Sequence, residues 1–189
     1  MAGVPDAKEQ SFFHRRNLPH FQGAGGPLYV TFCTRDRWAL PAAARAAVLR
    51  HCLHDHGSKM ILHCAVVMPD HVHLIYQPLQ DSRGVHYGTA EIVGGLKGAA
   101  AHAVNGLLKR KGPVWQRESF DRVLRSDEQG WVQIEYAIGN PVRKALCQAP
   151  EDYLWMWVNP DLTGFRGVPD SVARAIRRRN AGKPAEVQG

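Results

Sequence analysis

The sequence predicts a single α+β domain, on three observations. The chain has 189 residues, of which 44% are hydrophobic, and no internal repeat, which suits one substantial core. Its patterns follow the order strand, helix, strand, strand, helix, strand, helix. Proline and aspartate between the second and third strands predict a hairpin. We expect a basic leader at residues 1–26, the main domain at 27–150, and a packing segment with a basic tail at 151–189.

The first half of the domain is predicted to contain one strand, one helix and the hairpin. β-Branched and aromatic side chains mark the first strand. An alanine-rich run with apolar residues at helical spacing marks the helix, which Gly57 ends. The expected ranges are 27–34 for the first strand, 41–56 for the helix, and 59–67 and 71–77 for the hairpin strands.

The second half is predicted to contain a helix at 89–111, a strand at 114–124 and a further helix beginning at Ser126. Ser126 and Gln129 have the spacing of a capping box. Tyr136 lies off the apolar stripe of this helix, so it is not needed for the core.

Around residue 140 we expect the helix to be interrupted. Residues 139–141 read Gly-Asn-Pro, so Asn140 is an N-cap of a new helix, a metal ligand, or neither. A short basic helix is expected at 169–180.

Two histidines on the second hairpin strand are the first candidate for chemistry. His71 and His73 point to one side of the strand, because successive side chains alternate. Neutral imidazole is a common ligand for divalent metals, and a strand holds two donors at a constant separation. The alternative is a pair of half-exposed histidines without function.

The net charge of +7 and the pI near 9.5 indicate a polyanionic partner, with nucleic acid favoured over an anionic membrane. No run of about 18 apolar residues is present, and the start of the chain lacks the apolar core of a signal peptide. We therefore expect no membrane partner and an intracellular protein. The four scattered cysteines are expected to be free thiols.

Basic residues in several segments are candidate DNA contacts. On the strand at 114–124, arginines alternate with Trp115 and Phe120, a mixture that single-stranded nucleic acid binds. The alternatives are a charged edge strand there, a solvated leader and a solvated tail. The candidates are Arg15, Arg16, Lys97, Arg117, Arg122, Arg125, Arg143, Arg177 and Arg178.

Three segments together carry a resemblance to a known family. They are Val-Met-Pro-Asp-His-Val-His-Leu at 67–74, Val-Trp-Gln with Glu-Ser-Phe-Asp-Arg at 114–122, and Tyr-Ala-Ile-Gly-Asn-Pro-Val at 136–142, with a weaker match at 16–20. In order and spacing they resemble the IS200-like single-tyrosine transposases, and most closely the REP-associated tyrosine transposases of bacteria. The resemblance covers roughly residues 16–157.

This resemblance implies an HUH endonuclease with a ferredoxin-like, RRM-like antiparallel sheet. It implies that His71, His73 and Asn140 hold Mg²⁺ or Mn²⁺ and that Tyr136 is the nucleophile. The expected activity is cleavage and strand transfer of single-stranded, hairpin-forming REP-like DNA through a 5′-phosphotyrosine, without a nucleotide cofactor.

The same resemblance implies a monomer or homodimer in the bacterial cytoplasm, at the nucleoid. The alternative is a domesticated protein that binds a DNA hairpin without cutting it. The intact His71, His73 and Tyr136 argue against this alternative.

Overall fold

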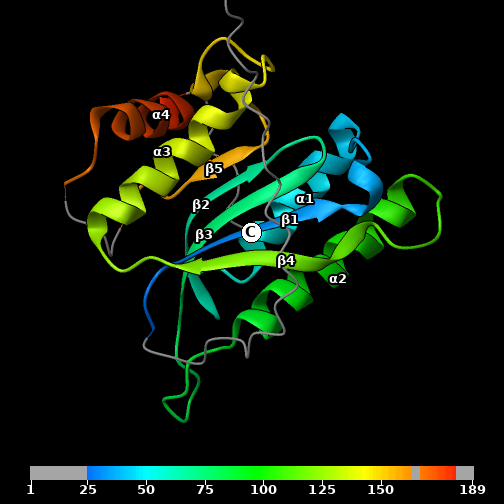
Figure 1. The fold of residues 1–189 in the computed structure, drawn as a ribbon, viewed down its shortest axis with the longest axis horizontal. Helices are drawn as coiled ribbons and strands as arrows, with labels where there is room; N and C mark the ends of the chain where they lie inside the picture. Colours follow the sequence, from blue (N-terminus) through cyan, green and yellow to red (C-terminus); the bar gives the residue numbers. More distant parts are fainter. Residues whose placement is uncertain (1–24, 163–166, 182–189) are drawn as a thin grey trace, which may run out of the picture.

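A five-stranded antiparallel sheet organises the fold (Figure 1). The structure is a computed structural model that describes residues 25–162 and 167–181. The strands are β1 (Leu28–Thr34), β2 (Met60–Val67), β3 (His71–Pro78), β4 (Trp115–Val123) and β5 (Met156–Val158), in the spatial order β4-β1-β3-β2-β5. The helices are α1 (Ala42–His54), α2 (Thr89–Leu107), α3 (Asp127–Arg143) and α4 (Asp170–Ala181), with short 3-10 turns η1 (Arg35–Arg37) and η2 (Pro150–Asp152).

The order β4-β1-β3-β2, with α1 and α2 as the connecting helices, is the ferredoxin-like arrangement, so the expected α+β class is confirmed. The fifth strand was not predicted. Residues 151–157 were expected only to pack, but Met156–Val158 pairs with β2 and extends the sheet. Three residues are too few to show the alternation that identifies a strand in a sequence.

The two faces of the sheet have different coverings. On one face, Leu28, Val30 and Phe32 of β1 pack with apolar residues of α1 and α2 in one core cluster. On the other face, α3 packs against β2 and β3, and Trp131 and Ile134 are buried there. In Figure 1, α3 and α4 lie beside β5 and β2, at the opposite edge of the sheet from β4.

The predicted interruption of α3 at residues 139–141 is wrong. The helix runs through Asn140 and Pro141 and ends at Arg143. Pro141 lies in the last turn, where its missing N–H removes a single helical hydrogen bond. The hydrogen bonds that follow are kept: the Lys144 amide donates to the Asn140 carbonyl oxygen, and the Leu146 amide donates to the Pro141 carbonyl oxygen. Asn140 is therefore no cap: it lies inside α3, one turn after Tyr136.

The predicted start of α3 is confirmed. The Ser126 hydroxyl accepts a hydrogen bond from the Gln129 amide at 3.2 Å, and the Gln129 side chain accepts one from the Arg125 amide at 2.9 Å. The four cysteines are free thiols, as expected. Within the described ranges, no helix combines the length and apolar character needed to cross a membrane.

Candidate metal and nucleophile site

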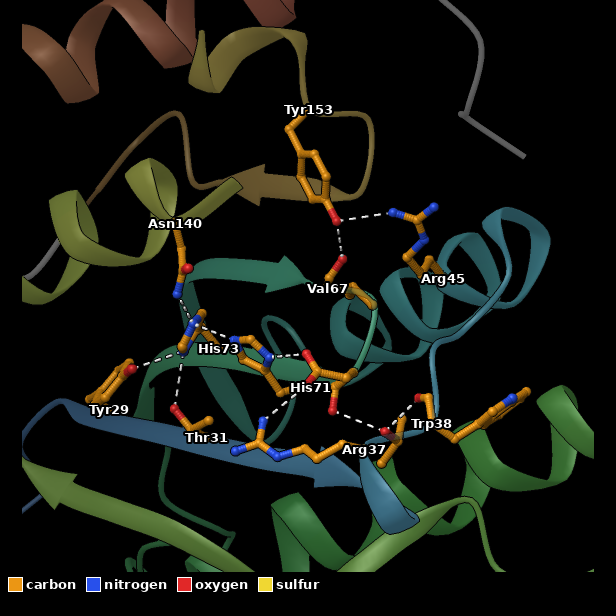
Figure 2. Close-up of polar contacts among 12 residues, drawn as sticks. Tyr29, Thr31, Arg37, Trp38, Arg45, Val67, His71, His73, Asn140 and Tyr153 are labelled. Atoms are coloured by element: carbon orange, nitrogen blue, oxygen red, sulfur yellow. Dashed lines mark hydrogen bonds and ion pairs between the residues drawn. The ribbon is translucent and has the colours of Figure 1, made fainter. Parts of the chain in front are cut away.

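His71 and His73 lie on the face of the sheet that α3 partly covers, whereas Val72 points into the core on the other face. In the sheet register, His73 lies beside Thr31 of β1 and Val66 of β2. The turn before His71 is held by buried Thr34, whose amide and hydroxyl both donate to the Asp70 carbonyl oxygen, at 2.8 and 3.0 Å. The start of β3 is thus tied to the end of β1 (Figure 2).

The Asp70 carboxylate orients His71. Its Oδ1 lies 2.6 Å from His71 Nδ1, and its Oδ2 lies 3.1 Å from a guanidinium nitrogen of Arg37. Burial opposes the Asp70 charge, but the hydrogen bond from His71 and the Arg37 guanidinium outweigh it and lower the pKa of Asp70. Because a carboxylate only accepts, His71 Nδ1 carries the proton and Nε2 is left with its lone pair.

His73 is 3% exposed and is held on both sides. Its Nδ1 lies 2.8 Å from the Tyr29 hydroxyl and 3.1 Å from the Thr31 hydroxyl. Its Nε2 lies 2.6 Å from the Asn140 amide nitrogen and 3.1 Å from His71 Nε2. Because the amide nitrogen donates, Nε2 of His73 also carries a lone pair, and it lies next to Nε2 of His71 (Figure 2).

Both imidazoles are kept neutral. Burial is the largest cause that lowers the pKa of His73 to about 3, and the positive charge of Arg143 acts in the same direction. Burial also lowers the pKa of His71, although the hydrogen bond to Asp70 works in the opposite direction. Neutral imidazole is the form that binds a metal.

The spacing of the two histidines fits a shared divalent ion. Metal–nitrogen bonds of about 2.0–2.1 Å at near-right angles place two ligating nitrogens about 3 Å apart. The two Nε2 atoms are 3.1 Å apart. Across residues 25–162 and 167–181, no group of three His, Cys, Asp or Glu side chains has a metal-binding arrangement, so a third ligand from these described residues would be of another type.

The Asn140 amide is in place to be that ligand. It is 4% exposed and reaches His73 from α3 across the sheet face (Figure 2). A 180° rotation of the amide about its last side-chain bond would direct Oδ1 to the point where Nδ2 now lies. An amide oxygen suits hard cations such as Mg²⁺ and Mn²⁺.

Tyr136 lies beside the histidines and is 47% exposed, as its position off the apolar stripe predicted. Its ring centroid is 5.7 Å from that of His73. The Arg143 guanidinium lies 4.5 Å from the centre of the Tyr136 ring and donates to the Tyr136 carbonyl oxygen. It passes closely over Gly139, where a Cβ would come within 2.8 Å of an Arg143 nitrogen.

Among the described residues, the other predicted DNA-contacting residues do not gather at the histidine site but lie on several elements. Arg117 and Arg122 are exposed on β4, and Arg125 is exposed just after it. The Lys97 ammonium instead donates to the carbonyl oxygens of Gln116 and Arg117, at 2.9 and 3.1 Å. Arg177 and Arg178 belong to α4, and Arg15 and Arg16 lie outside the described residues. DNA binding by these residues stays a prediction.

Sequence reasoning missed the residues that support the histidines. Tyr29 and Thr31 hold His73, and Asp70 and Arg37 hold His71. Asp70 was visible in the motif, directly before His71, as a carboxylate able to orient it. Tyr29 and Thr31 alternate on β1, but only the register between β1 and β3 brings them to His73.

Comparisons with known proteins support the fold. No protein-family model and no curated protein sequence matches the chain. Among solved structures, a REP-associated tyrosine transposase bound to a REP hairpin aligns with a TM-score of 0.61 and 18% identity, over 75% of this chain and 82% of that one. A proposed transposase from Deinococcus radiodurans R1 aligns with a TM-score of 0.41 and 20% identity, over 57% of this chain and 85% of that one. The first alignment shows that this chain has the fold of a transposase.

Proposed function

We propose that this chain is a metal-dependent endonuclease and strand transferase that acts on single-stranded, hairpin-forming DNA through a 5′-phosphotyrosine. One observation carries the proposal: the Nε2 atoms of His71 and His73 and the Asn140 amide converge beside the exposed ring of Tyr136. The shared fold with a transposase that binds a REP hairpin supports DNA as the substrate.

His71, His73 and Asn140 would hold Mg²⁺ or Mn²⁺. The bound ion would polarise the scissile phosphate and stabilise the charge that develops on it. The protein's own contribution is to keep both imidazoles neutral and to fix their Nδ1 atoms on oxygen partners, so that both Nε2 atoms remain available.

In the proposed reaction, the Tyr136 hydroxyl oxygen attacks a DNA phosphorus atom. The bond from this oxygen to phosphorus forms as the bond from phosphorus to the 3′-oxygen breaks. The tyrosine hydroxyl loses its proton, and the departing 3′-oxygen gains one. Because the phosphodiester is exchanged for a phosphotyrosine ester of similar energy, the 3′-hydroxyl is able to reverse the reaction, and no nucleotide cofactor is required.

Both halves of the proposed site come from one chain. His73 is on β3 and Tyr136 is on α3 of the same molecule, with ring centroids 5.7 Å apart. We propose that the two residues act together within one molecule. Arg143, held against the Tyr136 ring, is placed to receive a phosphate at the nucleophile.

The test is covalent capture of DNA. The protein is incubated with single-stranded oligonucleotides carrying palindromic repeats, with Mn²⁺ or with EDTA, and run on a denaturing protein gel. We expect an adduct with Mn²⁺ only, which Tyr136→Phe abolishes. Tyr87→Phe is the matched control, because Tyr87 packs in the core cluster of the opposite face, and it should retain the adduct.

Two results would count against the proposal. An adduct formed by Tyr136→Phe would exclude Tyr136 as the nucleophile. Binding to several hairpins with no adduct would favour a protein that recognises DNA without cutting it.

A further inference from the structure

An aromatic side chain lies exposed on the sheet surface next to the candidate site. Phe120 of β4 is 59% exposed, although most large apolar side chains of the sheet are buried. In the register it lies beside Thr31 of β1, and Thr31 in turn lies beside His73 of β3. These side chains share the face on which α3 packs against β2 and β3.

Phe120 is also held in orientation. Its ring meets the Tyr29 ring edge-on, with centroids 6.4 Å apart and planes at 67°. Tyr29 itself is buried and stacks on His73, with ring centroids 5.8 Å apart. A row of rings therefore leads from the histidine site to an exposed aromatic surface.

We propose that Phe120 is a stacking site for an unpaired nucleobase of the DNA strand that enters the active site, with Arg122 contacting the adjoining phosphate. The inference rests on the proposed function and adds a base-binding subsite to it. An exposed aromatic ring on a sheet surface is a common platform for single-stranded nucleic acid, since every base presents a flat face to stack.

The distance from the histidines suits this role. Phe120 and His73 are two strands apart, which corresponds to about 10 Å at the usual strand spacing. One or two nucleotides span such a distance, so a base stacked on Phe120 belongs close to the phosphate held at the histidine site.

Charge favours nucleic acid over an apolar protein partner as the occupant. Arg122 lies beside Tyr29 on the same face, is exposed, and has no carboxylate partner within the described residues. Arg117 and Arg125 are exposed on the same segment. A base-paired stem would not expose the flat face of its bases, so the occupant is an unpaired nucleotide.

The test uses 2-aminopurine, a fluorescent base that stacking quenches. Single-stranded oligonucleotides with a hairpin carry it at one position at a time and are titrated with the Tyr136→Phe protein, in which cleavage cannot occur. We expect quenching at one unpaired position, loss of that quenching with Phe120→Ala, and its retention with Phe120→Trp. Dissociation constants should rise roughly 5-fold to 100-fold with Phe120→Ala.

Leu107→Ala is the matched control, because Leu107 is also an exposed apolar residue but lies at the end of α2. It should leave binding and quenching unchanged. An abasic nucleotide at the quenched position should weaken DNA binding by the protein that retains Phe120. In the Phe120→Ala protein the same abasic nucleotide should weaken DNA binding no further. Affinity and quenching that survive Phe120→Ala would overturn the proposal.

The outcomes separate this inference from the proposed function. A normal Tyr136-dependent adduct without any quenched position overturns the stacking site and leaves the nuclease in place. A second outcome is quenching that depends on Phe120 while the protein with Tyr136 forms no adduct. This outcome supports the base-binding site and overturns the proposed nuclease. Absence of DNA binding altogether overturns both.

Discussion

The two faces of the sheet use the same strands for different purposes. On β3, Val72, Leu74 and Tyr76 point into the core beneath α1 and α2, while His71 and His73 point to the face where α3 lies. The covered face is closed by two helices, whereas the other face leaves Tyr136 and Phe120 exposed. One strand thus supplies both a rigid support and the groups that it positions, because its side chains alternate.

A cavity in the covered face should have the largest effect on stability. Leu74 is fully buried there, so Leu74→Ala should lower the free energy of unfolding by about 2–5 kcal/mol. Urea denaturation measures this. The adduct rate per folded molecule should remain close to wild type, and a large loss in that rate would show that the two faces are not separable.

Removal of a candidate metal ligand from the other face should lower the adduct rate and leave the protein folded. We expect His73→Ala to reduce the rate of adduct formation by about 100-fold or more, since ligand loss costs at least as much as loss of a supporting residue. Single-turnover cleavage with Mn²⁺ measures the rate, and a cooperative thermal transition confirms folding. A rate near wild type would remove His73 from the site.

A buried histidine outside the candidate site, His63, can be compared with His73. His63 of β2 is fully buried, and burial, with the charge of His56, lowers its pKa to about 4. Below pH 6.5 the unfolded chain binds a proton that the folded chain does not, so the stability contributed by neutral His63 is lost as the pH falls from 6.5 to 4.

His63→Leu should therefore flatten the decline of the urea midpoint over that pH range, by an amount equivalent to about 1–3 kcal/mol. An unchanged pH slope would show that His63 titrates normally in the folded protein. Adduct formation at pH 7 should not depend on this residue, in contrast to His73.

The smallest expected effect concerns Gly139, which makes room for Arg143 beside Tyr136. Gly139→Ala should stabilise α3 by up to about 1 kcal/mol. Its Cβ would displace the Arg143 guanidinium, so the adduct rate should fall roughly 2- to 5-fold, as in Arg143→Ala. Gly98→Ala on α2 is the control, because its Cβ would meet open space. A loss with Arg143→Ala but none with Gly139→Ala would contradict this account.

Local patterns predicted most of the elements because their signals lie within a few residues of one another. The capping box at Ser126, the hairpin turn at Pro69 and the apolar stripe of α3 all correspond to the structure. Prediction failed at Pro141, because a proline near a helix end costs too little to stop a well-packed helix. It failed at β5 because pairing with β2 defines that strand.

By itself, the sequence determined that His71 and His73 share one side of a strand and that Tyr136 lies off the apolar stripe of its helix. Both follow from the periods of strands and helices. Only the tertiary structure decided that the Asn140 amide meets His73, and that Tyr29 and Phe120 extend the site across the sheet. These contacts join residues far apart in the chain, so they depend on strand register and on the packing of α3 against the sheet, which no local pattern contains.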